Sequence, residues 1–121
     1  MNWTWWIFCS GLLGAMGVGA GAFGGHALKS KLTMEQLATY DIAVRYQFYH
    51  AFALLGVALL ASHVDNWLVK CSGWLFLCGS IFFSGSLYLL VLTSIRWMGF
   101  VTPIGGGLLI LGWLFLAAAS R

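Results

Sequence analysis

The sequence predicts an all-α integral membrane protein, namely a four-helix bundle with a short interfacial helical segment between the first and second spans. The first observation is composition. Hydrophobic residues make up 61% of the 121 residues and charged residues only 7%, whereas a soluble domain carries roughly 25% charged residues. The second observation is that four apolar stretches each approach the length of about 20 residues that a membrane helix needs. We therefore predict a single membrane domain over residues 1–121.

The four predicted spans are separated by short polar loops and cover residues 3–27, 44–63, 67–93 and 102–119. The first span begins with Trp3, Trp5 and Trp6, which is typical of the aromatic belt at a membrane interface. The fourth span is predicted to open at Thr102 and Pro103, because threonine is a good N-cap and proline is tolerated at the first helical position.

A capping pattern predicts where the helix before the second span begins. Thr33 is followed three residues later by Gln36, the spacing at which the two residues can bond each other's backbone. Residues 34–63 as one helix would measure about 45 Å, against a hydrocarbon core of about 30 Å. We therefore expect residues 34–44 to lie at the interface or to extend the second span.

Glycines recur in the first and fourth spans at helical spacing. Gly17, Gly21 and Gly25 form successive GxxxG steps, and Gly105 and Gly106 lie near the start of the fourth span. A further small-residue ridge in the first span consists of Gly11, Ala15 and Gly19. Such ridges let two helices approach closely in lipid. Two alternatives stay open: packing inside the bundle, or packing against another subunit.

Polar residues concentrate in one run, Arg45-Tyr46-Gln47-Phe48-Tyr49-His50. At helical spacing Tyr46 and His50 share a face, and Gln47 lies near His50. Polar groups within hydrocarbon must face protein or water, because leaving them unpaired is costly. We predict an intramembrane polar cluster whose candidate members are His26, Arg45, Tyr46, Gln47, Tyr49, His50, Ser84, Ser86 and Tyr88.

Charged residues predict an ion pair and a topology. Asp41 and Arg45 are four residues apart, so an intrahelical ion pair near the headgroups is expected. Four basic residues lie in or near the first and third loops, namely Lys29, Lys31, Arg45 and Arg96. Two, Lys70 and Arg121, lie on the other side. Because basic loops stay in the cytoplasm, both termini are predicted to lie on the non-cytoplasmic side.

Several blocks of sequence together resemble one known family. They are residues 21–29, 46–51, 83–90, 102–106 and 112–113. On these blocks the chain resembles the YgdD/YwdK family of small bacterial inner-membrane proteins with a domain of unknown function. Gly25 stands where that family usually has alanine. The resemblance covers nearly the whole chain and implies four helices and a place in the bacterial cytoplasmic membrane, but it transfers no activity.

Three classes of function remain for the polar cluster. A structural or accessory subunit is favoured, with the lipid bilayer and a homo-oligomer or larger membrane complex as partners, because the chain is small and has no catalytic motif. The alternative is an oligomeric transporter or channel for ions, protons or small solutes that uses the polar face around His50. An enzyme acting on a lipid or quinone is disfavoured, since no nucleophile–base pair or paired carboxylates occur.

Cofactors and nucleic acid are not expected. His26 and His50 could lie near each other and ligate haem, but neither belongs to a ligand-spacing motif. The three cysteines have no CxxC spacing, which argues against zinc or a disulfide framework. The net charge of +3 is small and dispersed, unlike a nucleic-acid footprint.

Overall fold

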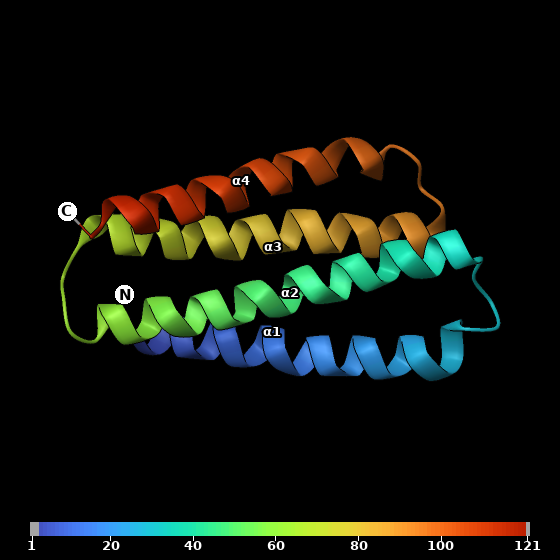
Figure 1. Cartoon of the computed structure of the whole chain (residues 1–121), viewed down its shortest axis with the longest axis horizontal. Helices are drawn as coiled ribbons and strands as arrows, with labels where there is room; N and C mark the ends of the chain where they lie inside the picture. Colours follow the sequence, from blue (N-terminus) through green and yellow to red (C-terminus); the bar gives the residue numbers. More distant parts are fainter. Residues whose placement is uncertain (1–2, 121) are drawn as a thin grey trace.

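The computed structural model describes residues 3–120 and contains four long helices that run alternately up and down (Figure 1). The helices are α1 (Trp3–Phe23), continued by the π-helical turn η1 (Gly24–Leu28), then α2 (Met34–Ala61), α3 (Trp67–Thr93) and α4 (Met98–Ala118). All four are long and apolar enough to span a membrane. The predicted all-α membrane bundle is therefore confirmed.

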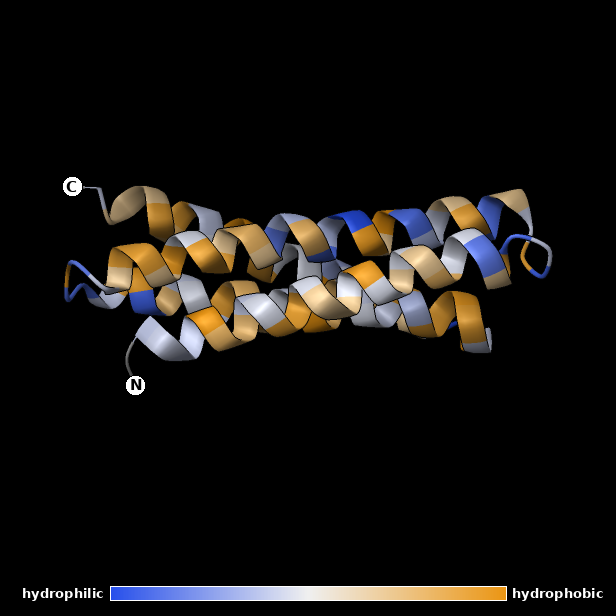
Figure 2. Ribbon diagram, turned by 90° about the horizontal axis from the view of Figure 1, so that it is seen from below, coloured by the Kyte–Doolittle hydropathy of each residue, from blue (hydrophilic) through white to orange (hydrophobic). Residues whose placement is uncertain are grey.

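Each helix packs mainly against its neighbours in the chain. The helix α2 packs on α1 and on α3, and α3 packs on α4, which gives the order seen in Figure 1. Within residues 3–120, α1 and α4 do not pack along each other. The central helices α2 and α3 are consequently the most buried, while α1 and α4 each leave most of their surface exposed. Orange and pale segments make up most of the ribbons, and the blue, hydrophilic segments lie in the end loops and at some positions in the middle of the helices (Figure 2).

The core consists of two hydrophobic clusters. The first is built around Trp6, Leu54 and Phe76 and occupies the end where α1 begins. The second, around Tyr40 and Val91, occupies the end where α2 begins.

Glycines allow the closest approach between α3 and α4. A Cβ atom at Gly105 would lie 2.7 Å from the Cα of Phe83, and one at Gly79 would lie 2.8 Å from the Cγ of Leu109. Real Cβ contacts are not that short, so the two backbones can approach this closely only at glycine.

The glycines of α1 and η1 divide into two groups. Gly17 packs against the ring of Phe48, and Gly21 lies against Val44, so both face α2. Gly25 is exposed and has nothing within 4 Å of where its Cβ would lie. The same holds for two members of the second ridge, Gly11 and Gly19.

The start of α2 follows the predicted capping box. The amide of Gln36 donates to Thr33 Oγ1 at 3.1 Å, and the amide of Thr33 donates to Gln36 Oε1 at 2.9 Å. No helix-breaking residue follows, so residues 34–44 run directly into the second span as part of one helix. The helix therefore begins ten residues before the predicted span bound of residue 44, as expected if residues 34–44 extend the second span.

The prediction that the fourth helix opens at Thr102 and Pro103 was wrong. The helix α4 begins at Met98, and Pro103 lies inside it. The Thr102 hydroxyl does not cap the helix but lies 2.5 Å from the hydroxyl of Ser86 on α3. Pro103 lacks the N–H that would bond the carbonyl of Gly99, so one helix hydrogen bond is lost near the helix start.

Candidate functional site

Gln47 connects three helices inside the bundle. Its side chain is only 4% exposed. Gln47 Nε2 donates to the Leu13 carbonyl of α1 at 2.8 Å, and the Tyr88 hydroxyl of α3 donates to Gln47 Oε1 at 2.6 Å. The ring of Tyr88 also lies against that of Tyr40, whose hydroxyl donates to the carbonyl of Ala20. These contacts join α1, α2 and α3 over about two helical turns.

His50 is buried with both ring nitrogens engaged. Trp113 Nε1 of α4 donates to His50 Nε2 at 3.1 Å, and His50 Nδ1 lies 2.7 Å from the Tyr46 carbonyl. An indole N–H can only donate, so Nε2 carries no proton and Nδ1 donates to Tyr46. The ring packs against Phe76, with centroids 5.6 Å apart. His50 is therefore a neutral histidine in a fixed tautomer, with no free lone pair for a metal.

Buried serines form further hydrogen bonds between helices. Ser84 Oγ donates to the carbonyl of Ala43 at 2.7 Å, which joins α3 to α2. Ser10 Oγ donates to the carbonyl of Ala51 at 2.7 Å, which joins α1 to α2. Ser80 Oγ is buried without a hydrogen-bond partner among the described residues. Most of the buried polar side chains thus bind backbone or side chains of neighbouring helices.

The other predicted members of the cluster lie elsewhere. His26 is exposed in η1, so it does not meet the buried His50. Arg45, Tyr46 and Tyr49 lie on the exposed surface of α2. The structure thus brings Gln47, His50, Ser84, Ser86 and Tyr88 into the interior and leaves the remaining four outside.

Three contributors to this interior were not predicted. They are Ser10, Tyr40 and Trp113, none of which is among the nine predicted members of the cluster. Tyr40 and Trp113 could have been found from their residue type, because buried tyrosine and tryptophan usually find a hydrogen-bond partner for their polar atom.

The side chains that usually bind metal ions are scattered in the part of the chain that is described. No group of three or more His, Cys, Asp or Glu side chains that could hold a metal ion occurs among these residues. All three cysteines are free thiols, with Cys9 buried in α1 and Cys71 and Cys78 partly buried in α3.

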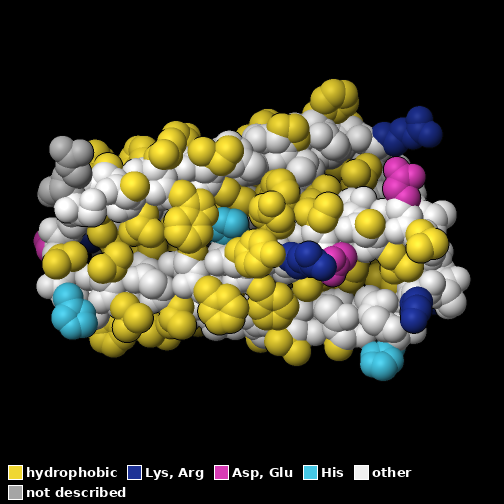
Figure 3. Space-filling view, in the orientation of Figure 1, with side chains coloured by type: hydrophobic (Ala, Val, Ile, Leu, Met, Phe, Trp, Pro, Cys, Tyr) yellow, Lys and Arg dark blue, Asp and Glu magenta, His cyan; other side chains and the backbone are white. Residues whose placement is uncertain are grey.

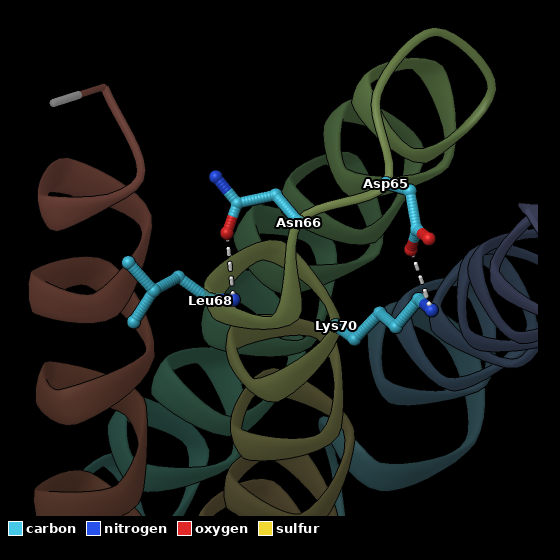
Figure 4. Close-up of polar contacts among 4 residues, drawn as sticks. All are labelled: Asp65, Asn66, Leu68 and Lys70. Atoms are coloured by element: carbon cyan, nitrogen blue, oxygen red, sulfur yellow. Dashed lines mark hydrogen bonds and ion pairs between the residues drawn. The ribbon is translucent and has the colours of Figure 1, made fainter.

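The turn between α2 and α3 carries a helix cap and an ion pair (Figure 4). Asn66 Oδ1 accepts from the amide of Leu68 at 2.9 Å, and Asp65 Oδ1 lies 2.8 Å from Lys70 Nζ. The hydrogen bond and the charge of Lys70 lower the pKa of Asp65 below its ordinary value. A lowered pKa contributes stability that is present at neutral pH and is lost only when the pH falls through that lowered value.

Two substitutions at this turn should distinguish the contribution of the helix cap to stability from that of the ion pair. Asn66→Ala is expected to lower the free energy of unfolding by about 1 kcal/mol, because the first turn of α3 loses its cap. Asp65→Asn is expected to lower the unfolding temperature at pH 7 only slightly, because both partners of this ion pair are at least half exposed and solvent screens their attraction. Thermal unfolding of both variants in one detergent measures this. A larger loss for Asp65→Asn than for Asn66→Ala would contradict the assignment.

Comparison with known proteins places this architecture in a family. The model of a family described as a protein of unknown function (DUF423) matches residues 20–106. The chain belongs to the DUF423 family. Membrane proteins named UPF0382 are similar to it over most of their length, and no solved structure matches it. The resemblance to the YgdD/YwdK family is thereby confirmed.

Two relatives show how far this DUF423 likeness extends. The UPF0382 membrane protein SSP2132 of Staphylococcus saprophyticus is 45% identical over 117 residues, which cover 94% of each chain. The UPF0382 membrane protein YwdK of Bacillus subtilis is 40% identical over 106 residues, 87% of this chain and 86% of that one. The DUF423 chain is therefore a membrane protein that is similar in sequence to these relatives over most of its length.

Proposed function

We propose that this protein is a structural or accessory subunit of the bacterial cytoplasmic (inner) membrane, working within a larger membrane complex. The observation that carries the proposal is the bonding of His50. Its Nε2 accepts from Trp113 and its Nδ1 donates to the Tyr46 carbonyl. A histidine that relays protons must release and take up a proton at an accessible nitrogen, and both nitrogens of His50 are occupied.

The hydrogen bonds between helices support the same proposal. Gln47, Ser84 and Tyr88 bind atoms of neighbouring helices. Bonds of this kind fix the register of membrane helices, each contributing about 0.6 kcal/mol and at most about 2 kcal/mol. A set of them gives a rigid bundle that a partner protein could use as a fixed surface.

The orientation belongs to the same proposal. The first and third loops hold more lysine and arginine than the second, so we place them in the cytoplasm and both termini on the opposite side. A reporter fused after the last residue that is active only outside the cytoplasm should be active. Activity of a cytoplasm-only reporter at that position would reverse the orientation.

Flux measurements distinguish a structural subunit from a transporter. The protein is reconstituted into liposomes loaded with a pH-sensitive dye, and a proton or potassium gradient is imposed. We expect no flux above that of empty liposomes for the wild type or for His50→Ala, with an added ionophore as the positive control. A wild-type flux that His50→Ala abolishes would overturn the proposal in favour of the transporter.

The accessory role has its own test. Gentle extraction from native membranes, followed by native mass spectrometry, should yield the chain together with one dominant protein of different mass. Extraction of this chain free of any other protein would count against a larger complex, whatever the flux assay gives.

A further inference from the structure

One ion pair lies on the outer surface of a helix that spans the membrane. Arg45 Nε contacts Asp41 Oδ2 at 2.8 Å, one turn apart on α2. The side chains are 63% and 55% exposed, and Asp41 also borders a hollow lined by Gly21, Gly24 and Gly25. The hydroxyl of Tyr49, one turn further along, forms no hydrogen bond within residues 3–120, and Tyr49 is 52% exposed. Asp41, Arg45 and Tyr49 together define a polar stripe on α2.

The length of α2 places Arg45 inside the hydrocarbon region. The helix has 28 residues and is about 42 Å long, about 12 Å more than the hydrocarbon core. Arg45 comes eleven residues after Met34, or about 16 Å along the axis. Even if the whole excess projected beyond the Met34 end, the Arg45 backbone would still lie about 4 Å inside the core. If the excess length is divided equally between the two ends of α2, Asp41 also lies inside the hydrocarbon core.

The space-filling view agrees with this placement. Figure 3 shows a basic and an acidic side chain side by side well away from both ends, surrounded by hydrophobic side chains. Ionisable residues facing lipid at such depth are costly, and they usually turn toward protein or water. Among residues 3–120 no helix covers the charged groups of the stripe, so any protein that shields them has to come from outside the chain.

We propose that the polar stripe of α2 is the interface through which two copies of this chain form a dimer. The stripe is self-complementary, because it presents one positive and one negative group a single helical turn apart. A two-fold axis lets Arg45 of each copy reach Asp41 of the other, which closes two further ion pairs at once. A partner with a purely acidic or purely basic face would leave one of the two charges uncompensated. The dimer does not depend on the proposed function, since either could hold without the other.

Two charge-reversal variants of the full-length protein, expressed singly and then together, test this interface. The variants Arg45→Asp and Asp41→Arg each place two like charges on the stripe, so each alone is expected to lose the dimer mass in native membrane extracts. Expressed together with different tags, they are oppositely charged and should pair with each other. Pull-down by one tag should then recover the other variant.

Two further variants serve as controls. The double variant Asp41→Arg with Arg45→Asp restores the pair in reversed order, so its dimer should return to the wild-type fraction. Asp65→Lys reverses a charge in the exposed turn between α2 and α3, and its dimer should not change. Loss of dimer in the double variant would show that the stripe is not self-complementary and would overturn the proposal.

Three other outcomes would also overturn it. They are a wild-type chain that is monomeric with only lipid bound, a chain bound solely to another protein, and single variants that remain dimeric. The two proposals fail separately, because a chain bound solely to another protein would end only the dimer proposal, whereas a dimer free of other proteins would count only against the larger complex.

Discussion

Gly105→Ala is expected to lower the free energy of unfolding by about 3 kcal/mol, at the upper end of the range for overpacking. The added Cβ would lie 2.7 Å from the Cα of Phe83 and 2.8 Å from the carbonyl carbon of Phe82. These are backbone atoms, so no side-chain rotation can relieve the contact. The helix α4 would have to move away from α3 as a whole, which would also strain the contact between the hydroxyls of Ser86 and Thr102.

Two neighbouring glycines supply matched controls. At Gly106 the new Cβ would meet only the ring of Phe83, at 3.7 Å, and at Gly107 it would meet nothing within 4 Å. Alanine favours the helix over glycine by about 1 kcal/mol, so both variants should be neutral or slightly stabilising. Thermal unfolding of the three variants in the same detergent gives the comparison. Equal behaviour of Gly105→Ala and Gly107→Ala would contradict the close approach of α3 and α4.

Gln47→Leu is expected to lower the free energy of unfolding by about 2 kcal/mol. Leucine nearly fills the volume but removes the acceptor of the Tyr88 hydroxyl and the donor to the Leu13 carbonyl. A polar group left in the interior without a partner costs about 1 to 3 kcal/mol. Thermal or denaturant unfolding of the purified variant measures the change.

A double substitution isolates the bond itself. Adding Tyr88→Phe to Gln47→Leu removes the stranded hydroxyl, so the double variant should be more stable than the sum of the two single changes predicts. Tyr46→Phe is the control, because the Tyr46 hydroxyl makes no hydrogen bond within residues 3–120 and its removal should change stability by less than about 0.5 kcal/mol. If the free energy of unfolding of the double variant changes by the sum of the two single changes, Gln47 and Tyr88 are not coupled.

The fold could be predicted because it follows from length and composition. Four apolar stretches separated by short polar loops leave a membrane helix bundle as the simplest arrangement. The start of α2 was also predictable, since the Thr33 capping box is entirely local. The start of α4 was not, because the Thr102 hydroxyl bonds Ser86 on another helix, and a capping pattern carries no information about tertiary partners.

The candidate site was only partly predictable, for a geometric reason. The polar run of residues 45–50 spans nearly two helical turns, so its members must point to all sides of α2. Gln47 and His50 face inward, whereas Arg45 and Tyr49 face outward. Spacing indicates which residues share a face, but it does not show which face meets α1 and α3. The bond from Trp113 to His50 depends on how α4 packs, which no local pattern encodes.

The absence of packing between α1 and α4 bears on how the chain assembles as it leaves the ribosome. Most contacts join helices that follow each other, so each emerging helix meets its main partner already in the bilayer. By the time α2 is inserted, it can form its three hydrogen bonds with α1, through Ser10, Tyr40 and Gln47. Folding dominated by such sequence-local contacts is fast. The bond from Trp113 to His50 can form only after the last helix is inserted, so it is among the last contacts to be made.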